Sequence, residues 1–283
     1  MDSGHPTWAE VNLSALEANI RNIRSLLKPS VRYCAVVKAD GYGHGAPAVA
    51  RVALNLGADY LAVAFLSEAL ALRAAGITAP LLILGFTPPL SAPAVAANNL
   101  TQTIYTQEQA EALARAGDAA GRPVRVHVKI DTGMNRLGIA PEEAVSFCGT
   151  AARLRGITLE GIFTHFATAD SRDKTLARRQ FALFTEAVNA VKDWGIPLPL
   201  CHCANSAAIL DLPETHLDMV RAGIIQYGLR PSPETGEPFV PRPVMSLKTR
   251  IARIRTIPAG AHVSYGAAFT ATRPTVLATL PVG

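Results

Sequence analysis

The sequence lacks the features that mark membrane, secreted and nucleic-acid-binding proteins. No apolar run approaches the roughly 18 residues that span a bilayer, and the opening residues MDSGHPTWAEVNL lack the charged-then-apolar layout of a signal peptide. No run of lysine and arginine is longer than two, so the formal charge of +5 does not indicate a nucleic-acid partner. These absences predict a cytoplasmic protein with neither a membrane nor a nucleic acid as its partner.

Cysteine is also scarce, with four residues in the chain. Two of them stand in the triplet Cys201, His202, Cys203, whose neighbouring side chains would point to opposite faces of a strand. No second cysteine pair accompanies this triplet to complete a typical metal site. We therefore expect buried thiols in a reducing compartment and no bound metal.

The composition is that of a folded protein with a large core. The chain has 283 residues, of which 49% are hydrophobic and 17% are charged. This is enough apolar material for a large domain and a smaller second unit, and it excludes general disorder.

Short apolar runs alternate with helical patterns along most of the chain. The opening helix is NLSALEANIRNIRSLL, and the segments QEQAEALARAGDAAG and DKTLARRQFALFTEAVNAVKDWG are later helices. Eight continuous apolar runs, which suit strands covered on both sides, predict a parallel (β/α)8 barrel. In chain order these runs are YCAVV, YLAV, LLIL, QTIY, VRVHVKI, LEGIFT, PLCHC and HLDMV.

The character of the sequence changes after the linker GLRPSPETGEPFVPRP. The segments VMSLKTRIARIRTI, AHVSYGAAF and TVLATLPV that follow are predicted strands without helices between them. We predict a barrel domain over residues 1–234 and a C-terminal all-β domain over residues 235–283. The β domain is expected to be incomplete, because the chain stops on an apolar strand.

Polar residues stand at the ends of the predicted barrel strands, where the loops of such barrels form the active site. The first is the lysine of CAVVKADGYGHG, which ends an apolar run and is followed by three glycines. The strand-end residues are Lys38, Lys129 with Asp131, His165, Asn205 with Ser206, and Arg221.

Two of the later loops predict a phosphate site. Ser206 heads a short helical segment, and the sequence RAGI supplies backbone N–H groups at Gly223 and Ile224. A lysine combined with a phosphate cradle favours pyridoxal phosphate held as a Schiff base, because a desolvated amine condenses with the aldehyde while the phosphate anchors the ring.

Seven segments resemble, in order and spacing, the signature segments of alanine racemases. They are TWAEVNLSALEANI, AVVKADGYGHGA, VKIDTGMNRLGI, THFATAD, CHCANSAA, RAGIIQYGLRPS and HVSYGAAF, and together they extend over nearly the whole chain. The resemblance implies that Lys38 carries the cofactor and that Tyr265 is the second catalytic base. The remaining roles that it implies are phosphate binding by Tyr42, Ser206, Gly223 and Ile224, packing of His165 near the ring beside Arg221, contact of Arg136 with substrate or cofactor, and a carbamylated Lys129.

These roles agree with the chemistry of racemisation, which removes the α-proton from one face and returns one to the other. Two acid/bases on opposite sides of the cofactor do this most simply, and Lys38 and Tyr265 would be that pair. Arg221 beside the pyridine nitrogen would keep that nitrogen unprotonated, because a guanidinium does not give up its proton. The resemblance further implies a homodimer with shared active sites that supplies D-alanine for peptidoglycan.

Three alternatives remain open. The first is a racemase of another small amino acid such as serine. The second is an amino-acid decarboxylase of the same architecture, although the lysine and glycine motifs resemble that group less closely. The third is a single-barrel protein that binds pyridoxal phosphate for homeostasis without catalysis, against which the linker and HVSYGAAF argue. The sequence stops short of the family's usual C-terminal segment, which leaves the activity of this form an open question.

Overall fold

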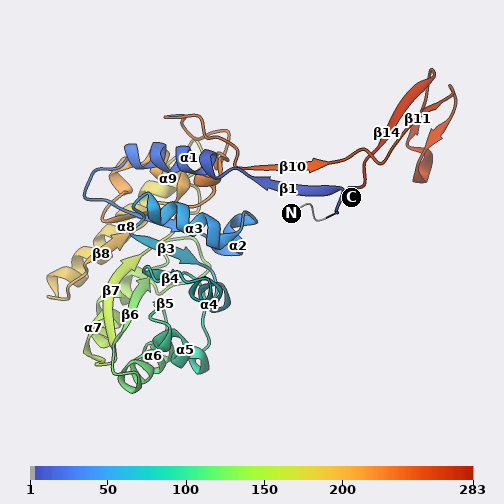
Figure 1. Cartoon of the computed structure of the whole chain (residues 1–283). Helices are drawn as coiled ribbons and strands as arrows, with labels where there is room; N and C mark the ends of the chain where they lie inside the picture. The colour runs from blue at the N-terminus through green and yellow to red at the C-terminus, as the bar shows by residue number, and fades with distance from the viewer. Residues whose placement is uncertain (1–3, 283) are drawn as a thin grey trace. The chain divides into compact units, whose positions relative to one another are not determined.

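The computed structural model describes residues 4–282. Residues 4–12 and 245–282 form one compact unit, and Leu13–Val244 form the other (Figure 1). The second of these units contains the predicted barrel.

The larger unit holds an eight-stranded sheet in the order β8-β7-β6-β5-β4-β3-β2-β9. Every ladder in it is parallel. The backbone N–H groups of Asp218 and Arg221 donate to the carbonyls of Cys201 and Ala204, at 3.1 and 3.0 Å, and so bring β9 against β8 and close the ring. The strands are β2 (Arg32–Val36), β3 (Tyr60–Val63), β4 (Leu81–Ile83), β5 (Thr101–Ile104), β6 (Val124–Lys129), β7 (Ile157–Phe163), β8 (Leu200–His202) and β9 (Met219–Ala222). The predicted (β/α)8 barrel and its eight strands are thus confirmed.

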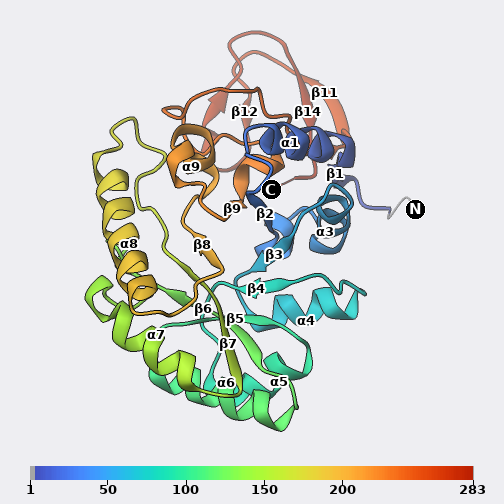
Figure 2. The same ribbon diagram turned by 90° about the vertical axis from the view of Figure 1, so that its left-hand side faces the viewer.

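Helices cover the outside of this ring (Figures 1 and 2). The α-helices are α1 (Leu13–Ser25), α2 (Lys38–Tyr42), α3 (Ala46–Asn55), α4 (Leu66–Ala74), α5 (Ala92–Ala97), α6 (Gln107–Ala119), α7 (Ala144–Arg153), α8 (Thr175–Asp193) and α9 (Ser206–Asp211). The 3-10 helices are η1 (Pro89–Ser91), η2 (Pro141–Glu143), η3 (Pro213–Thr215) and η4 (Ile224–Tyr227).

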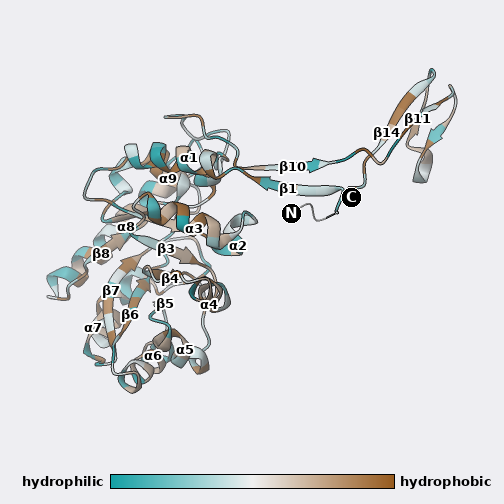
Figure 3. Ribbon diagram, in the orientation of Figure 1, coloured by the Kyte–Doolittle hydropathy of each residue, from teal (hydrophilic) through white to brown (hydrophobic). Residues whose placement is uncertain are grey.

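The helices have the local signals that their sequences predict. Thr106 caps α6, since its hydroxyl accepts from the N–H of Gln109 at 3.3 Å while the Gln109 side chain returns to the cap. On α8, buried side chains recur every three or four residues, including Ala177, Phe184 and Val191. Helix α8 thus has one apolar buried face, and the strands of the sheet are largely hydrophobic (Figure 3).

Side chains two residues apart share one face of a strand and fill the barrel interior. This is clearest on β2 and β3, which contribute Cys34, Val36, Tyr60 and Ala62 to one buried cluster. The cluster is completed by Leu82, Leu200 and Met219. All four cysteines are buried and unpaired, as expected.

The smaller unit consists of paired antiparallel strands. The strands are β1 (Thr7–Val11), β10 (Met245–Thr249), β11 (Arg253–Ile257), β12 (His262–Val263), β13 (Phe269–Thr270) and β14 (Thr275–Thr279), with the 3-10 helix η5 (Tyr265–Ala267). They pair as β1 with β10, β11 with β14, and β12 with β13. The run VMSLKTRIARIRTI therefore forms two strands in different sheets.

The pairing of β1 differs from the predicted domain ranges, which placed residues 1–234 together in the barrel. β1 pairs with β10 from Thr7 opposite Thr249 to Val11 opposite Met245. Its side chains are half-buried or exposed, whereas β3 is buried throughout. A strand with this pattern suits a two-stranded ladder and not a sheet covered on both faces.

No helix within residues 4–282 is both long enough and apolar enough to cross a membrane.

Candidate active site

A cavity of about 470 Å³ lies at the carboxyl ends of the barrel strands. Parallel strands all end at one face of a barrel, which is why side chains from distant parts of the sequence meet there. The predicted site residues that line it are Lys38, Tyr42, Lys129, Arg136, His165, Asn205, Ser206 and Arg221. Sequence reasoning missed the apolar lining, which includes Phe65, Phe86 and Phe163. The sequence contains a signal for this lining, because Phe65 and Phe86 follow β3 and β4 within a few residues, as Lys38 follows β2.

The glycine-rich stretch after Lys38 forms a left-handed turn. Ala39, Asp40, Gly41 and Tyr42 have φ values of 50°, 51°, 64° and 54°. Each non-glycine residue there costs about 1–2 kcal/mol, a strain that proteins keep mainly at functional sites. The Asp40 carboxylate holds the turn by accepting from the N–H of Ala46 at 2.7 Å. The Lys38 ammonium consequently lies 5.8 Å from the centre of the Tyr42 ring.

One end of the cavity is a small polar cradle. The N–H of Gly223 donates to the Ser206 hydroxyl at 2.9 Å. A Cβ at position 223 would lie 3.0 Å from the Tyr42 hydroxyl and 3.4 Å from that of Ser206, so glycine keeps this space open. Asn205 caps the short helix α9, since its side-chain oxygen accepts from the N–H of Ala208 at 3.1 Å. The geometry suits a small anion bound by hydroxyl and backbone groups.

Arg221 lies within β9 and not after it, and its side chain is buried. It donates to Nδ1 of His202 at 2.7 Å, to the Thr164 carbonyl at 2.9 Å and to Nδ1 of His165 at 3.2 Å. Burial lowers the pKa of Arg221 to about 10, which leaves it protonated near neutral pH. Burial, followed by the charge of Arg221, holds the pKa of His165 well below its usual value, so this ring is neutral.

Lys129 and Arg136 also line the cavity. Burial, and next the charge of Arg221, lower the pKa of Lys129 to about 7. The Lys129 ammonium lies 5.1 Å from the centre of the Phe163 ring. Asp131 folds the following loop by accepting from the N–H groups of residues 133, 134 and 135, at 2.9, 3.0 and 3.0 Å. This loop carries Arg136 to the cavity.

Tyr265, the predicted second base, belongs to the smaller unit, and its side chain is fully exposed. It stands on the 3-10 turn η5 and not within a strand. The adjacent Ser264 and Ala267 have φ values of 61° and 47°, so the turn is strained where it presents the phenol.

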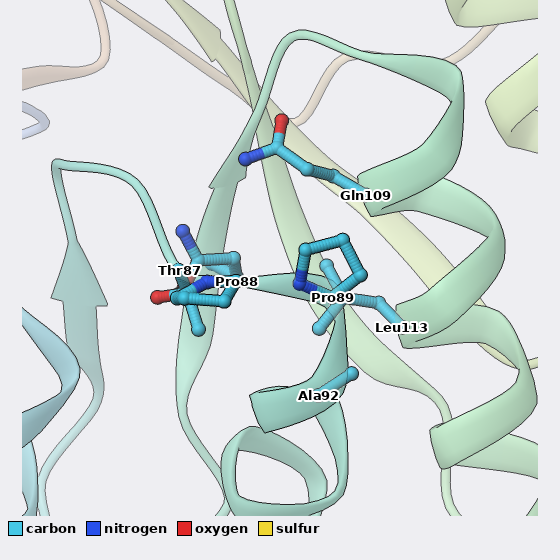
Figure 4. A pocket seen from close by; sticks show the side chains of 7 residues that line it. Thr87, Pro88, Pro89, Ala92, Gln109 and Leu113 are labelled. Carbon is cyan, nitrogen blue, oxygen red and sulfur yellow. The ribbon is translucent and has the colours of Figure 1, made fainter.

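A second cavity, of about 10 Å³, lies between η1, α5 and α6 (Figure 4). Thr87, Pro88 and Leu113 are among its lining residues, and the Gln109 amide nitrogen is buried with no hydrogen-bond partner in the described structure. The space is close to that of one water molecule, which would satisfy the amide. This cavity has no charged group in its lining, and we assign it to packing.

Comparison with known proteins gives one family over the whole chain. The models "Alanine racemase, N-terminal domain" and "Alanine racemase, C-terminal domain" match residues 11–231 and 244–283. The alanine racemase of Desulfovibrio desulfuricans is 55% identical over 278 residues, which cover 98% of this chain and 75% of that protein.

Solved structures agree with this result. The alanine racemase of Clostridium difficile 630 superposes with a TM-score of 0.96 at 41% identity, covering 100% of this chain and 74% of that one. A histidine racemase from Leuconostoc mesenteroides has a TM-score of 0.90 at 28% identity, covering 99% and 75%. This chain therefore spans about three quarters of the proteins that it resembles.

Proposed function

The chain belongs to the alanine racemase family, and from this premise we propose that it interconverts L-alanine and D-alanine with pyridoxal phosphate as cofactor. The observation that carries the proposal is the strand-end cavity, where Lys38, Tyr42, Ser206 and Arg221 meet. A lysine amine at one place and an anion cradle at another are the two attachments that this cofactor needs.

The cavity residues fit the cofactor. The open space that Gly223 preserves between the Tyr42 and Ser206 hydroxyls suits its phosphate, with the N–H groups of Gly223 and Ile224 nearby. Lys38 would hold it covalently, and Asn205 would fix the cradle by capping α9. When bound, pyridoxal phosphate supplies the electron sink that makes the α-proton of an amino acid removable.

The chain's own residues then handle the protons. We assign Lys38 to one face of the substrate and Tyr265 to the other, each taking or returning the proton at Cα. Arg136 would bind the substrate carboxylate or the cofactor's phenolic oxygen. Arg221, protonated at neutral pH, would donate to the ring nitrogen and keep that nitrogen unprotonated, while neutral His165 packs beside it. A weak electron sink of this kind suppresses side reactions such as transamination.

The wider role follows from the product. D-Alanine is a building block of peptidoglycan, and we propose that this activity supplies it. We also propose that the protein is cytoplasmic and that it forms a homodimer with shared active sites. A racemase of serine, or a carrier of pyridoxal phosphate without catalysis, is the competing function. The histidine racemase among the structural neighbours shows that substrates differ within this fold.

The proposed activity is tested with the 283-residue chain loaded with pyridoxal phosphate. L-Alanine, L-serine and L-histidine are supplied separately, and each D-product is quantified by chiral chromatography. We expect D-alanine to form with the highest kcat/KM, because the chain belongs to the alanine racemase family. Faster formation of D-serine would identify serine and not alanine as the substrate. Bound cofactor without turnover would favour the non-catalytic carrier of pyridoxal phosphate.

A separate prediction concerns the Lys129 carbamate. Only a neutral amine reacts with carbon dioxide, and the pKa of about 7 makes this amine roughly half neutral at pH 7. The carbamate of Lys129 should therefore increase as the pH rises through about 7 at constant dissolved carbon dioxide. A ¹³C carbamate resonance after addition of labelled bicarbonate measures it.

Two variants make that measurement specific. The resonance should disappear in Lys129→Ala and persist in Lys28→Ala, which alters an exposed lysine between α1 and β2 that does not line the cavity. A resonance that survives Lys129→Ala, or that decreases as the pH rises, would contradict the assignment.

A further inference from the structure

A chain of hydrogen-bonded polar side chains runs from Arg221 at the cavity through two buried histidines to the partly exposed Glu160. Nη1 of Arg221 on β9 lies 2.7 Å from Nδ1 of His202 on β8, and Nε2 of His202 lies 2.9 Å from Nδ1 of His127 on β6. Nε2 of His127 lies 3.2 Å from Oε2 of Glu160 on β7, which also accepts from the Tyr60 hydroxyl on β3. Both histidines are completely buried, so their partners are these side chains and not solvent.

The proton positions on the two histidines follow from Arg221, at one end of the hydrogen-bonded series. A guanidinium only donates, so Nδ1 of His202 accepts and its single proton is on Nε2. That proton is donated to Nδ1 of His127, which places the His127 proton on Nε2, facing Glu160. Every donor then has one acceptor, in the direction Arg221 to His202 to His127 to Glu160. Burial lowers the pKa of both histidines, which agrees with two neutral rings.

The backbone is shaped to admit this chain. The register between β6 and β7 shifts at Val126/His127, so Leu159 and Gly161 have partners while Glu160 is the extra residue of a bulge. A Cβ at Gly161 would lie 2.9 Å from Cε1 of the His127 ring, and only glycine leaves room for that ring. Bulges of this kind re-aim side chains beside active sites.

Neutral imidazoles, and no acidic side chain among residues 4–282, contact the charged end of Arg221. Within residues 4–282 the ion pairs do not include Arg221, although its side chain is buried. Its side-chain partners are the imidazoles of His202 and His165. The His202 ring is held by stacking on Phe163, with centroids 4.8 Å apart and an interplanar angle of 5°. Rotation of the ring within its plane is fixed by its hydrogen bonds to Arg221 and His127.

We propose that Glu160 is a positioning residue, the terminal acceptor that orients His127 and through it His202, so that Nδ1 of His202 holds the Arg221 guanidinium at the cavity. The link to catalysis rests on the proposed function, in which Arg221 faces the cofactor ring. The hydrogen-bonded chain itself does not depend on it.

The first test needs no cofactor. The 283-residue chain with ¹⁵N-labelled histidine should show His127 and His202 as neutral rings protonated at Nε2. It should also show a scalar coupling across the N–H···N bond from Nε2 of His202 to Nδ1 of His127. His216, whose Nε2 contacts the Ile209 carbonyl at 3.1 Å, is the internal reference. A protonated His202, or a proton on its Nδ1, would overturn the proposal in the unmodified protein.

Two substitutions separate hydrogen bonding from charge. Glu160→Gln keeps an oxygen that accepts from His127 and Tyr60, and it should preserve the coupling. Glu160→Leu removes the acceptor, so the coupling should vanish while the His216 resonances stay unchanged. Glu111→Gln, an exposed substitution on α6, is the matched control. An intact coupling in Glu160→Leu, or equal loss in both Glu160 variants, would overturn the role of acceptor.

The second test uses the chain loaded with pyridoxal phosphate. Glu160→Leu should lower kcat for D-alanine formation about 10-fold with KM nearly unchanged, as loss of an outer hydrogen-bond partner does at buried sites, and Glu160→Gln should restore most of it. A kcat in Glu160→Leu equal to that of the unmodified chain would overturn the positioning role. If the unmodified protein neither binds cofactor nor racemises alanine, the proposed function fails. The histidine couplings still decide whether the hydrogen bonds from Arg221 to Glu160 exist.

Discussion

Borohydride reduction of the chain loaded with pyridoxal phosphate should leave the pyridoxyl group on Lys38, and Lys38→Ala should lower D-alanine formation by about 10³-fold or more. Removal of this amine takes away both the covalent attachment and one of the two bases, and a positioned acid/base alone contributes about 10² to 10⁴ in rate. Peptide mapping by mass spectrometry identifies the labelled lysine, and chiral chromatography measures the loss of activity.

This experiment decides between two lysines, because Lys129 lines the same cavity. Its pKa of about 7 leaves about half of its amine neutral, and therefore nucleophilic, near pH 7. Geometry favours Lys38, which begins the strained turn leading to Tyr42 and the phosphate cradle, whereas Lys129 is buried at the end of β6. A pyridoxyl group on Lys129, or full labelling of Lys38→Ala, would contradict the assignment. Lys28→Ala is the control and should label and turn over as the unmodified chain does.

The barrel could be predicted from sequence because its signals are local. Most strands are short runs rich in apolar residues, and helices lie between most of them. The cavity residues at strand ends followed from the topology, since all parallel strands of a barrel finish at one face. The topology alone predicts that Lys38, Lys129 and Ser206 lie at one face, and all three line the same cavity.

Other features depend on contacts that no local pattern contains. The pairing of Thr7–Val11 with Met245–Thr249 joins the two ends of the chain, and TWAEV by itself is compatible with several partners. The left-handed turn after Lys38 includes Ala39 and Asp40, which seldom adopt positive φ, so the glycines indicated a turn but not its hand.

The hydrogen-bonded series from Arg221 to Glu160 could not be predicted either, because it too depends on contacts between distant segments. In VRVHVKI and PLCHC, His127 and His202 look like isolated polar residues in apolar strands. Their contact depends on the register of β6, β7 and β8, and on the bulge that brings Glu160 toward His127. A one-residue difference in register would point these side chains to the other face.

Tyr265→Phe should lower D-alanine formation by about 10² to 10⁴-fold while leaving attachment of the cofactor to Lys38 intact, because it removes one acid/base and no cofactor contact. The phenol is fully exposed in a single chain, and its strained turn is flanked by Val263 and Phe269 at the ends of a two-stranded ladder. A proton-transfer group works in a site that excludes water, so we propose that a second copy of the chain receives Tyr265 at its own cavity. A two-fold homodimer would then contain two equivalent shared sites.

Mixing Lys38→Ala chains with Tyr265→Phe chains tests this arrangement. A heterodimer of the two would contain one site with both bases and one site with neither. Each heterodimer should recover about half the activity of an unmodified dimer if the sites act independently. Native mass spectrometry confirms that subunits have exchanged, and chains carrying both substitutions, mixed with Lys38→Ala chains, are the control that should stay inactive. If exchange is complete and no activity returns, Tyr265 serves the cavity of its own chain, because each heterodimer would then lack one base at every site.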